Sequence, residues 1–143
     1  MKKLKIELHP QDVKVARRII NAYSTKGINP IIEAVTNPRR GRCGCALGVL
    51  GYVWGYPLFD SPKAWHKHCL DHTTCTVTDF LTDVSWFPKS IGLVRSNAEL
   101  WCDGLTYGFD TGLPKRSQTT KSFQRGNAVG RYVRRYLKNK GRM

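Results

Sequence analysis

Long hydrophobic runs are missing from this chain of 143 residues. No stretch of about eighteen consecutive apolar residues occurs, so a membrane-spanning helix is not expected. An apolar leader segment is missing too, because charged and polar residues follow the basic start Met1-Lys2-Lys3-Leu4-Lys5 at once. Together these absences predict a cytoplasmic protein without a membrane span.

Acidic side chains are scarce and scattered. Ten Asp and Glu residues stand against 24 Lys and Arg residues, which gives a formal net charge of +14. Because the acids are dispersed singly, no two-metal carboxylate site is visible. A basic excess of this size points to a negatively charged partner, and the candidates are nucleic acid, an acidic membrane surface or an acidic protein.

Signatures of catalysis are sparse as well. Asp71-His72 resembles the Asp-His pair of metal-dependent nucleases of the His-Asn-His type, but no histidine follows His72 to complete such a site. Cys43 or Cys45, near the start of a predicted helix, is an alternative nucleophile, with a histidine of residues 66–72 as its base. No oxyanion-hole sequence accompanies these groups. We therefore predict a protein that is not an enzyme, with a Cys-His hydrolase or nuclease as the alternative.

Hydrophobic residues are present in the amount that a folded domain needs. They make up 41% of the chain and include four Trp, six Tyr and five Phe. Their periodicity favours helices, so we predict a mainly α fold, with α+β as the alternative, in a single domain over residues 1–143.

The first helix is expected over residues 10–25, where Pro10 suits the first helical position and Gly27 follows the end. Its outer face carries Lys14, Arg17 and Arg18, which form a small basic patch. Asn29-Pro30 is then expected to open a short helix that continues to about residue 35.

A helix from Cys43 to Trp54 is predicted to be buried. It contains no charged residue, and its glycines lie three or four residues apart, so one side of it is nearly bare of side chains. Because each glycine costs a helix about 1 kcal/mol relative to alanine, we expect a closely packed neighbour on that side and place this helix at the centre of the fold. Further on, Ser96-Asn97-Ala98-Glu99 has the sequence of a capping box and is expected to start another helix.

Most of the net positive charge lies in residues 111–143, which contain ten Lys or Arg residues and no Asp or Glu. This segment is predicted to form a basic loop followed by a C-terminal helix. Its apolar residues recur at steps of three and four, so the helix can pack on the core while its basic residues face outward. Tyr132 and Tyr136 lie beside the apolar stripe, where core burial is favoured over base stacking.

We predict that the basic helix contacts phosphates, because a guanidinium group can bind a phosphate with two hydrogen bonds. The expected contacts are Arg131, Arg134, Arg135 and Lys138, with Arg125 and Lys121 of the same segment, Arg39, Arg40 and Arg42 of a glycine-hinged loop, and Arg17 and Arg18. No base-reading motif is present, so recognition by shape and charge is expected.

Cysteine and histidine residues form a candidate zinc site. The ligand set would be drawn from Cys43, Cys45, His68, His72 and Cys75. His68 and His72 are four residues apart and would share a helix face, but the Cys-x-Cys spacing is tighter than that of standard zinc motifs. The alternative is that these cysteines are small buried hydrophobic residues and that no cofactor is bound.

The block Cys43-Gly44-Cys45-Ala46-Leu47-Gly48 resembles the Cys-Ala-x-Gly helix of small uncharacterised domains from phage and actinobacterial proteins. In those domains a polar Asn-Asp segment and a last helix follow, and Cys102-Asp103 stands in that place here. The resemblance implies an accessory protein of a phage or mobile element that acts on host nucleoprotein machinery. The alternative partner is an acidic protein subunit, as for a structural or virion assembly protein.

Overall fold

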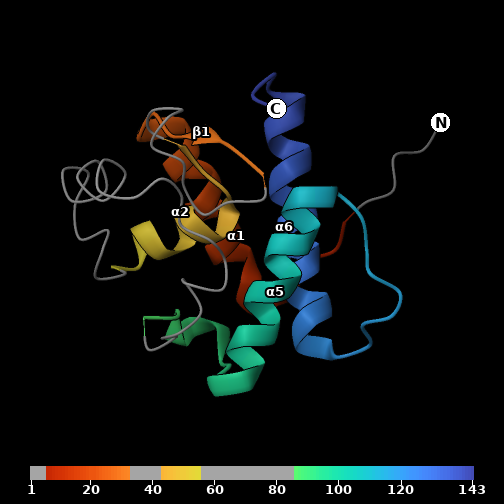
Figure 1. Ribbon diagram of the computed structural model, residues 1–143. Helices are drawn as coiled ribbons and strands as arrows, with labels where there is room; N and C mark the ends of the chain where they lie inside the picture. Colours follow the sequence, from red (N-terminus) through yellow and green to blue (C-terminus); the bar gives the residue numbers. More distant parts are fainter. Residues whose placement is uncertain (1–5, 33–42, 56–85) are drawn as a thin grey trace.

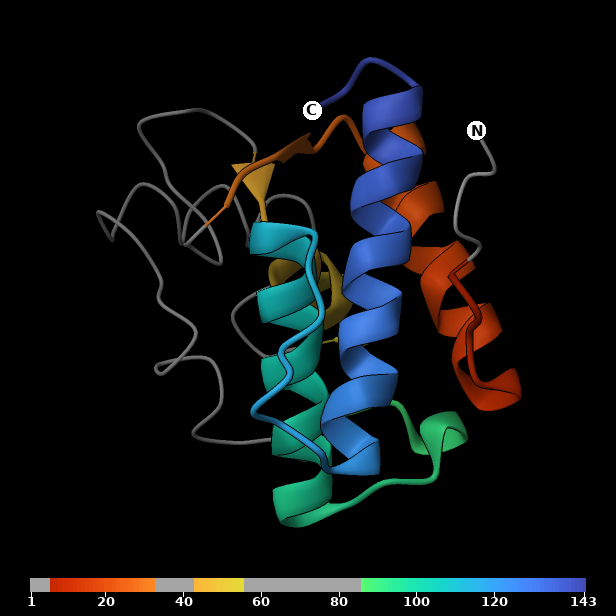
Figure 2. The same cartoon turned by 90° about the vertical axis from the view of Figure 1, so that its right-hand side faces the viewer.

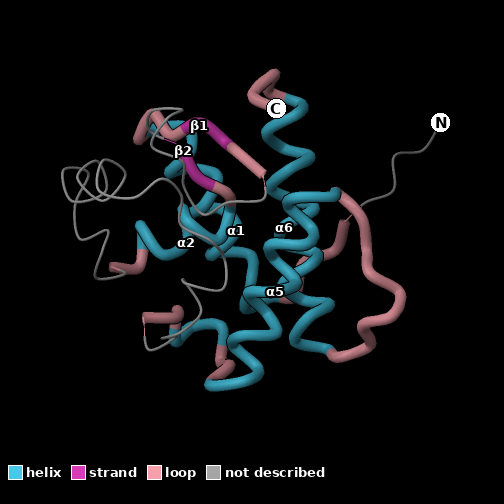
Figure 3. The backbone as a smooth tube through the Cα atoms, in the orientation of Figure 1, coloured by secondary structure: helices cyan, strands magenta, loops and turns pink. Residues whose placement is uncertain are grey.

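Helices dominate the part of the chain that the computed structural model describes, which comprises residues 6–32, 43–55 and 86–143 (Figures 1 and 3). The mainly α prediction is therefore confirmed. In chain order the elements are α1 (Pro10–Thr25), β1 (Asn29–Pro30), β2 (Cys43–Gly44), α2 (Ala46–Val53), the 3-10 helix η3 (Lys89–Ile91), α5 (Arg95–Thr111) and α6 (Lys121–Asn139). None of the helices within these residues combines the length and hydrophobicity that crossing a bilayer requires.

Helix α1 has the bounds that the sequence predicts. Pro10 occupies its first turn, where the missing N–H leaves no hydrogen bond unmade. His9 caps the helix, because its Nδ1 accepts a hydrogen bond from the Gln11 amide at 3.2 Å. Val15, Ile19 and Tyr23 are fully buried on the inner face.

The prediction of a helix opening at Asn29-Pro30 is wrong. These residues form strand β1, which pairs in parallel with β2 in the register Asn29 to Cys43 and Pro30 to Gly44. A residue before proline is driven from the helical to the extended region, which explains the strand at Asn29. The hydroxyl of Tyr23 donates to the Gly44 carbonyl at 2.7 Å and ties this small sheet to α1.

The glycine-containing helix α2 is shorter than predicted, because Cys43 and Gly44 belong to the sheet. Residues 46–51 are all buried, in agreement with the prediction of a buried helix. Side chains of α1, α2, α5 and α6 contribute to one hydrophobic cluster, in which Trp101 and Phe109 are the largest buried residues of α5.

Helices α1, α5 and α6 run in the same direction, with their N-terminal ends at the bottom of Figures 1 and 2. Short connections usually make neighbouring helices antiparallel. Here residues 112–120 lead back along the length of α5 before α6 begins, as Figure 2 shows. The side-chain amide of Asn127 fixes this loop on α6 by donating to the Leu113 carbonyl at 2.9 Å.

Glycines bring the backbones of α5 and α6 into direct contact. Gly104 and Gly108 of α5 face Gly126 and Gly130 of α6, and the members of each pair are four positions apart. A Cβ atom added at Gly104 would lie 2.7 Å from the Asn127 backbone nitrogen. Such an approach is open to glycine because it has no side chain. The structure shows glycine-dependent packing in this helix pair, and the corresponding expectation for residues 43–54 stays a prediction.

The predicted capping box does not start α5. The helix begins at Arg95, and its N-cap Val94 makes no side-chain capping bond. The Val94 carbonyl instead accepts from the amides of Asn97 and Ala98 at 3.1 and 3.4 Å. The chain therefore enters the helix before Ser96, which removes this residue from the position where its hydroxyl would cap.

Candidate nucleic-acid interface

Arg125 is part of a buried ion pair and faces inward, contrary to the predicted phosphate contact. Its Nη2 lies 2.7 Å from Oδ1 of Asp12 and its Nε donates to Oδ2 at 3.1 Å. Asp12 is completely buried and also accepts a hydrogen bond from Trp101 Nε1 at 3.3 Å. The pair therefore joins α1, α5 and α6 near their N-terminal ends.

Arg134 caps the C-terminal end of α5, and its contact with phosphate stays a prediction. Its Nη1 donates to the carbonyls of Phe109 and Asp110 at 2.8 and 2.9 Å. The last carbonyls of a helix lack partners within the helix and carry partial negative charge. Gly112, with φ of 72°, ends α5 and leaves room for the arginine, whose Cδ lies 3.1 Å from where a Cβ would be.

Arg142 fixes the end of α1 in a similar way. Gly141 and Arg142 donate to the carbonyls of Lys138 and Leu137, which is the hydrogen-bond pattern of a Schellman C-cap. This turn directs the Arg142 guanidinium to the backbone carbonyls of Tyr23 and Ile28, at 2.9 and 3.0 Å. Arg125, Arg134 and Arg142 thus hold the fold together.

Three other predicted contacts, Arg131, Arg135 and Lys138, line a hollow of about 270 Å³ beside α6, to which Arg134 also contributes. Arg135 and Lys138 are exposed, and Arg131 is half-buried. The Nε of Arg131 donates to Oδ1 of the buried Asn127 at 2.9 Å, which orients its side chain. Partial burial lowers the pKa of Arg131 from its ordinary value, and the positive charge of Arg135 lowers it further. Positive charge is therefore concentrated on this face.

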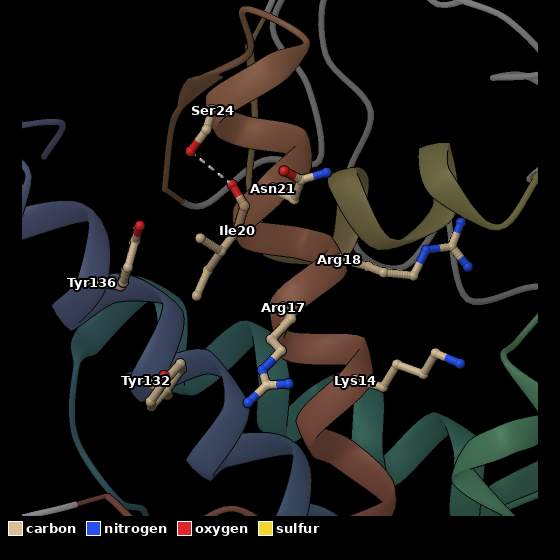
Figure 4. Close-up of a pocket in the computed structure, with 8 residues that line it drawn as sticks. All are labelled: Lys14, Arg17, Arg18, Ile20, Asn21, Ser24, Tyr132 and Tyr136. Carbon is tan, nitrogen blue, oxygen red and sulfur yellow. Dashed lines mark hydrogen bonds between the residues drawn. The ribbon is translucent and has the colours of Figure 1, made fainter.

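An open groove of about 710 Å³ lies between α1 and α6 (Figure 4). Tyr132 and Tyr136 form its α6 side, and Lys14, Arg17 and Arg18 come from α1. Tyr132 is 36% exposed, so the prediction that it is buried in the core is wrong, whereas Tyr136 is half-buried and packs against the hydrophobic cluster. We call this feature the α1–α6 groove.

The cations of the groove differ in how they are held. Arg18 is anchored, because its Nη2 donates to the Val53 carbonyl at 3.1 Å and its guanidinium lies 4.0 Å from the centre of the Trp54 ring. Lys14 and Arg17 are exposed and form no hydrogen bond or ion pair with the described residues. Their charges are available to a ligand.

We call the two basic groups together the cationic surface, although the groove and the hollow share no lining residue. It consists of Lys14, Arg17, Arg18, Arg131, Arg135 and Lys138, with the two tyrosines between the α1 and α6 members. No acidic side chain of the described residues lines the groove or the hollow. The acidic residues Glu99 and Asp103 lie on α5 and line neither feature. Lys121, another predicted phosphate contact, is exposed at the start of α6 and also lies outside the groove and the hollow.

Several predicted site residues lie outside the described residues, namely Arg39, Arg40 and Arg42 of the basic loop and His68, His72 and Cys75 of the candidate zinc site. The described members of the zinc set, Cys43 and Cys45, are completely buried. Within the described ranges no group of three or more His, Cys, Asp or Glu side chains is placed to hold a metal ion.

The Cys45 thiol is the reverse of an activated nucleophile. Burial raises its pKa to about 12, although hydrogen bonds from backbone amides such as that of Gly48 act in the opposite direction. We expected a lowered pKa from its place at a helix start, but removal from water outweighs that effect here.

Alkylation tests whether the Cys45 thiol is accessible and reactive in the folded protein. At pH 8, iodoacetamide is expected to leave Cys45 unmodified in the folded protein and to modify it fully in denaturant, because the thiol is buried and protonated. Peptide mass spectrometry locates the adduct, and the same digest of unfolded protein is the control. Rapid modification of Cys45 under native conditions would restore the cysteine-nucleophile alternative.

Comparisons with known proteins identify no relative. No protein-family model matches the chain, and no match was found among curated proteins or solved structures. The resemblance to Cys-Ala-x-Gly domains therefore stays a prediction, and the candidate interface rests on the geometry of this chain.

Proposed function

We propose that this protein binds nucleic acid, without catalysing a reaction, through the cationic surface of α1 and α6. The observation that carries the proposal is the α1–α6 groove, where exposed cations of α1 lie opposite the exposed Tyr132 and the half-buried Tyr136 without a lining carboxylate among the described residues. Nucleic acid offers what such a surface requires: a row of phosphates for the cations and aromatic bases for the tyrosines.

The arrangement favours a polyanion over a basic face that merely keeps the protein in solution. The arginines of α6 are divided between two roles, since Arg125 and Arg134 are hydrogen-bonded to Asp12 and to the end of α5 whereas Arg135 is exposed. The first two hold the helix on the core. The backbone positions of the exposed cations are therefore fixed, and a preorganised surface loses less conformational entropy on binding.

Recognition by charge and shape is expected. Phosphate contacts position a protein on nucleic acid but carry no sequence information. Two of the cations, Lys14 and Lys138, are lysines, which act as point charges. We therefore expect affinity to depend strongly on salt and weakly on sequence.

A salt titration tests the proposal. If all six cations contact phosphates, log affinity for a single strand should fall with log salt concentration with a slope of about −4, at about 0.7 per contact. Replacing Lys14, Arg17 and Lys138 by Gln should bring the slope to about −2. None of their side chains forms a hydrogen bond or ion pair with the described residues, so the fold should be unchanged.

The control removes the same amount of charge elsewhere. Lys26, Lys89 and Arg95 are exposed and line neither the groove nor the hollow. Replacing these three by Gln should leave the slope near −4, since the slope counts phosphate contacts. If the slope decreased equally in both triple variants, binding would depend on net charge alone. No salt-dependent binding to any nucleic acid would reject the proposed function and favour an acidic protein partner.

A further inference from the structure

We infer that the α1–α6 groove binds unpaired nucleotides, with bases stacked on Tyr132 and Tyr136 and the phosphates held by the cations on either side. This inference rests on the proposed function and narrows its ligand to single-stranded DNA or RNA. It depends on the position of the two tyrosines, which electrostatic binding to a duplex would not use.

The spacing of the tyrosines suits successive bases. Tyr132 and Tyr136 are four residues apart on α6, which corresponds to a rise of about 6 Å along the helix axis. Stacked bases lie about 3.4 Å apart, so two bases with one aromatic ring between them are separated by about 7 Å. A flexible single strand can open to this spacing and alternate its bases with the two rings.

The position of the cations suits the backbone of the same strand. Arg131 and Arg135 immediately precede the two tyrosines on α6, and the 100° turn between neighbouring helical residues places each tyrosine beside its arginine, on the α1 side. Arg17 points from the opposite wall of the groove toward Tyr132, and Lys14 lies one turn earlier on α1 with its side chain directed away from α6 (Figure 4). A strand lying over the tyrosines would have positive charge along both edges.

Paired strands cannot use the groove in this way. In a duplex each base is already stacked between its neighbours, and inserting a side chain requires unstacking that costs a few kcal/mol per step. The cations attract either form, whereas the tyrosines add affinity for exposed bases alone. Base stacking on aromatic side chains is also tolerant of sequence, in keeping with a surface that carries no base-reading motif.

The two tyrosines should contribute unequally. Lys140 lies over the Tyr136 ring, with Nζ 5.7 Å from the ring centre, so part of one ring face is covered. No cation–aromatic contact of this kind involves Tyr132 in the described part of the chain, and its side chain is the more exposed. Tyr132 is therefore the primary stacking residue.

Fluorescence anisotropy with a labelled 12-nucleotide strand of mixed sequence tests the inference, using DNA and RNA forms and the matched duplexes. We expect the single strands to bind more tightly than the duplexes at the same salt concentration. Tyr132→Ala should weaken single-strand binding about 5- to 150-fold, the range for loss of one stacked base, and leave duplex binding nearly unchanged. Tyr132→Phe should bind like the wild type, because the ring is retained.

A second measurement detects base stacking itself, independently of binding affinity. A 2-aminopurine base placed within the strand loses fluorescence when it stacks on an aromatic ring, so wild-type protein should quench it and Tyr132→Ala should quench it less. Equal affinity for single strands and duplexes, with Tyr132→Ala unchanged, would overturn this inference and leave the proposed function standing. A protein that binds none of the four oligonucleotides in a salt-dependent way would refute both.

Discussion

Gly126→Ala should destabilise the protein by about 3 kcal/mol or more, because the added methyl group has no room between α5 and α6. A Cβ at this position would overlap the backbone carbonyl oxygen of Trp101. Backbone atoms cannot rotate away as a side chain can, so the two helices would have to separate along their contact. Equilibrium denaturation in urea, followed by circular dichroism, gives the change in unfolding free energy.

The sign of the stability change in Gly126→Ala distinguishes close helix packing from intrinsic helix propensity. In a helix without the contact, replacing glycine by alanine stabilises by about 1 kcal/mol. The exposed Gln124 on the same helix provides that reference, since the difference between Gln124→Gly and Gln124→Ala measures intrinsic propensity in α6. If Gly126→Ala behaved like this pair and stabilised the protein, the close approach of α5 and α6 would be wrong.

Arg125→Ala is expected to cost about 3 to 5 kcal/mol of unfolding free energy, the usual penalty for leaving one charge of a buried pair unpaired. Asp12 has no exposed surface, and its remaining side-chain partner among the described residues would be Trp101 Nε1 at 3.3 Å. Because the pair joins three helices, the loss should appear in the stability of the whole fold. Thermal and urea denaturation of the variant measure it.

The replacement of both partners separates the ion pair from simple loss of packing. Asp12→Leu combined with Arg125→Met leaves no buried charge, so the double variant should lose clearly less stability than the two single changes added together. Lys121→Ala, on the exposed side of the same helix, should change the free energy by less than about 0.5 kcal/mol. Strict additivity of the single changes would argue against a coupled pair.

Local sequence signals predicted the elements that depend on local chemistry. Pro10 at the start of α1 and the apolar spacing of α6 specify these helices through rules that act within one or two turns. The strand at Asn29-Pro30 was also within reach, because proline drives the preceding residue toward extended conformations. The two glycine pairs at spacing four in α5 and α6 were a visible signal of close helix packing that the more glycine-rich segment 43–54 obscured.

Local sequence signals could not predict which arginines of α6 bind other parts of the fold and which are exposed to solvent. Arg125, Arg134 and Arg135 are the same residue type on one helix, and net charge or periodicity treats them alike. Their roles are set by residues distant in sequence, such as Asp12 for Arg125 and the last carbonyls of α5 for Arg134. Tyr132 was misplaced for the same reason, since its exposure depends on the groove that α1 leaves beside α6.

The return loop between α5 and α6 also limits how this chain can change in length. Helix α5 has 17 residues and spans about 25 Å. The nine residues 112–120, fully extended, reach about 30 Å. Deleting four of them would leave about 20 Å of extended chain, too little to run back along α5 to the start of α6, whereas an insertion would add little entropic cost. Natural length variation is therefore expected here as additions, with shortening selected against.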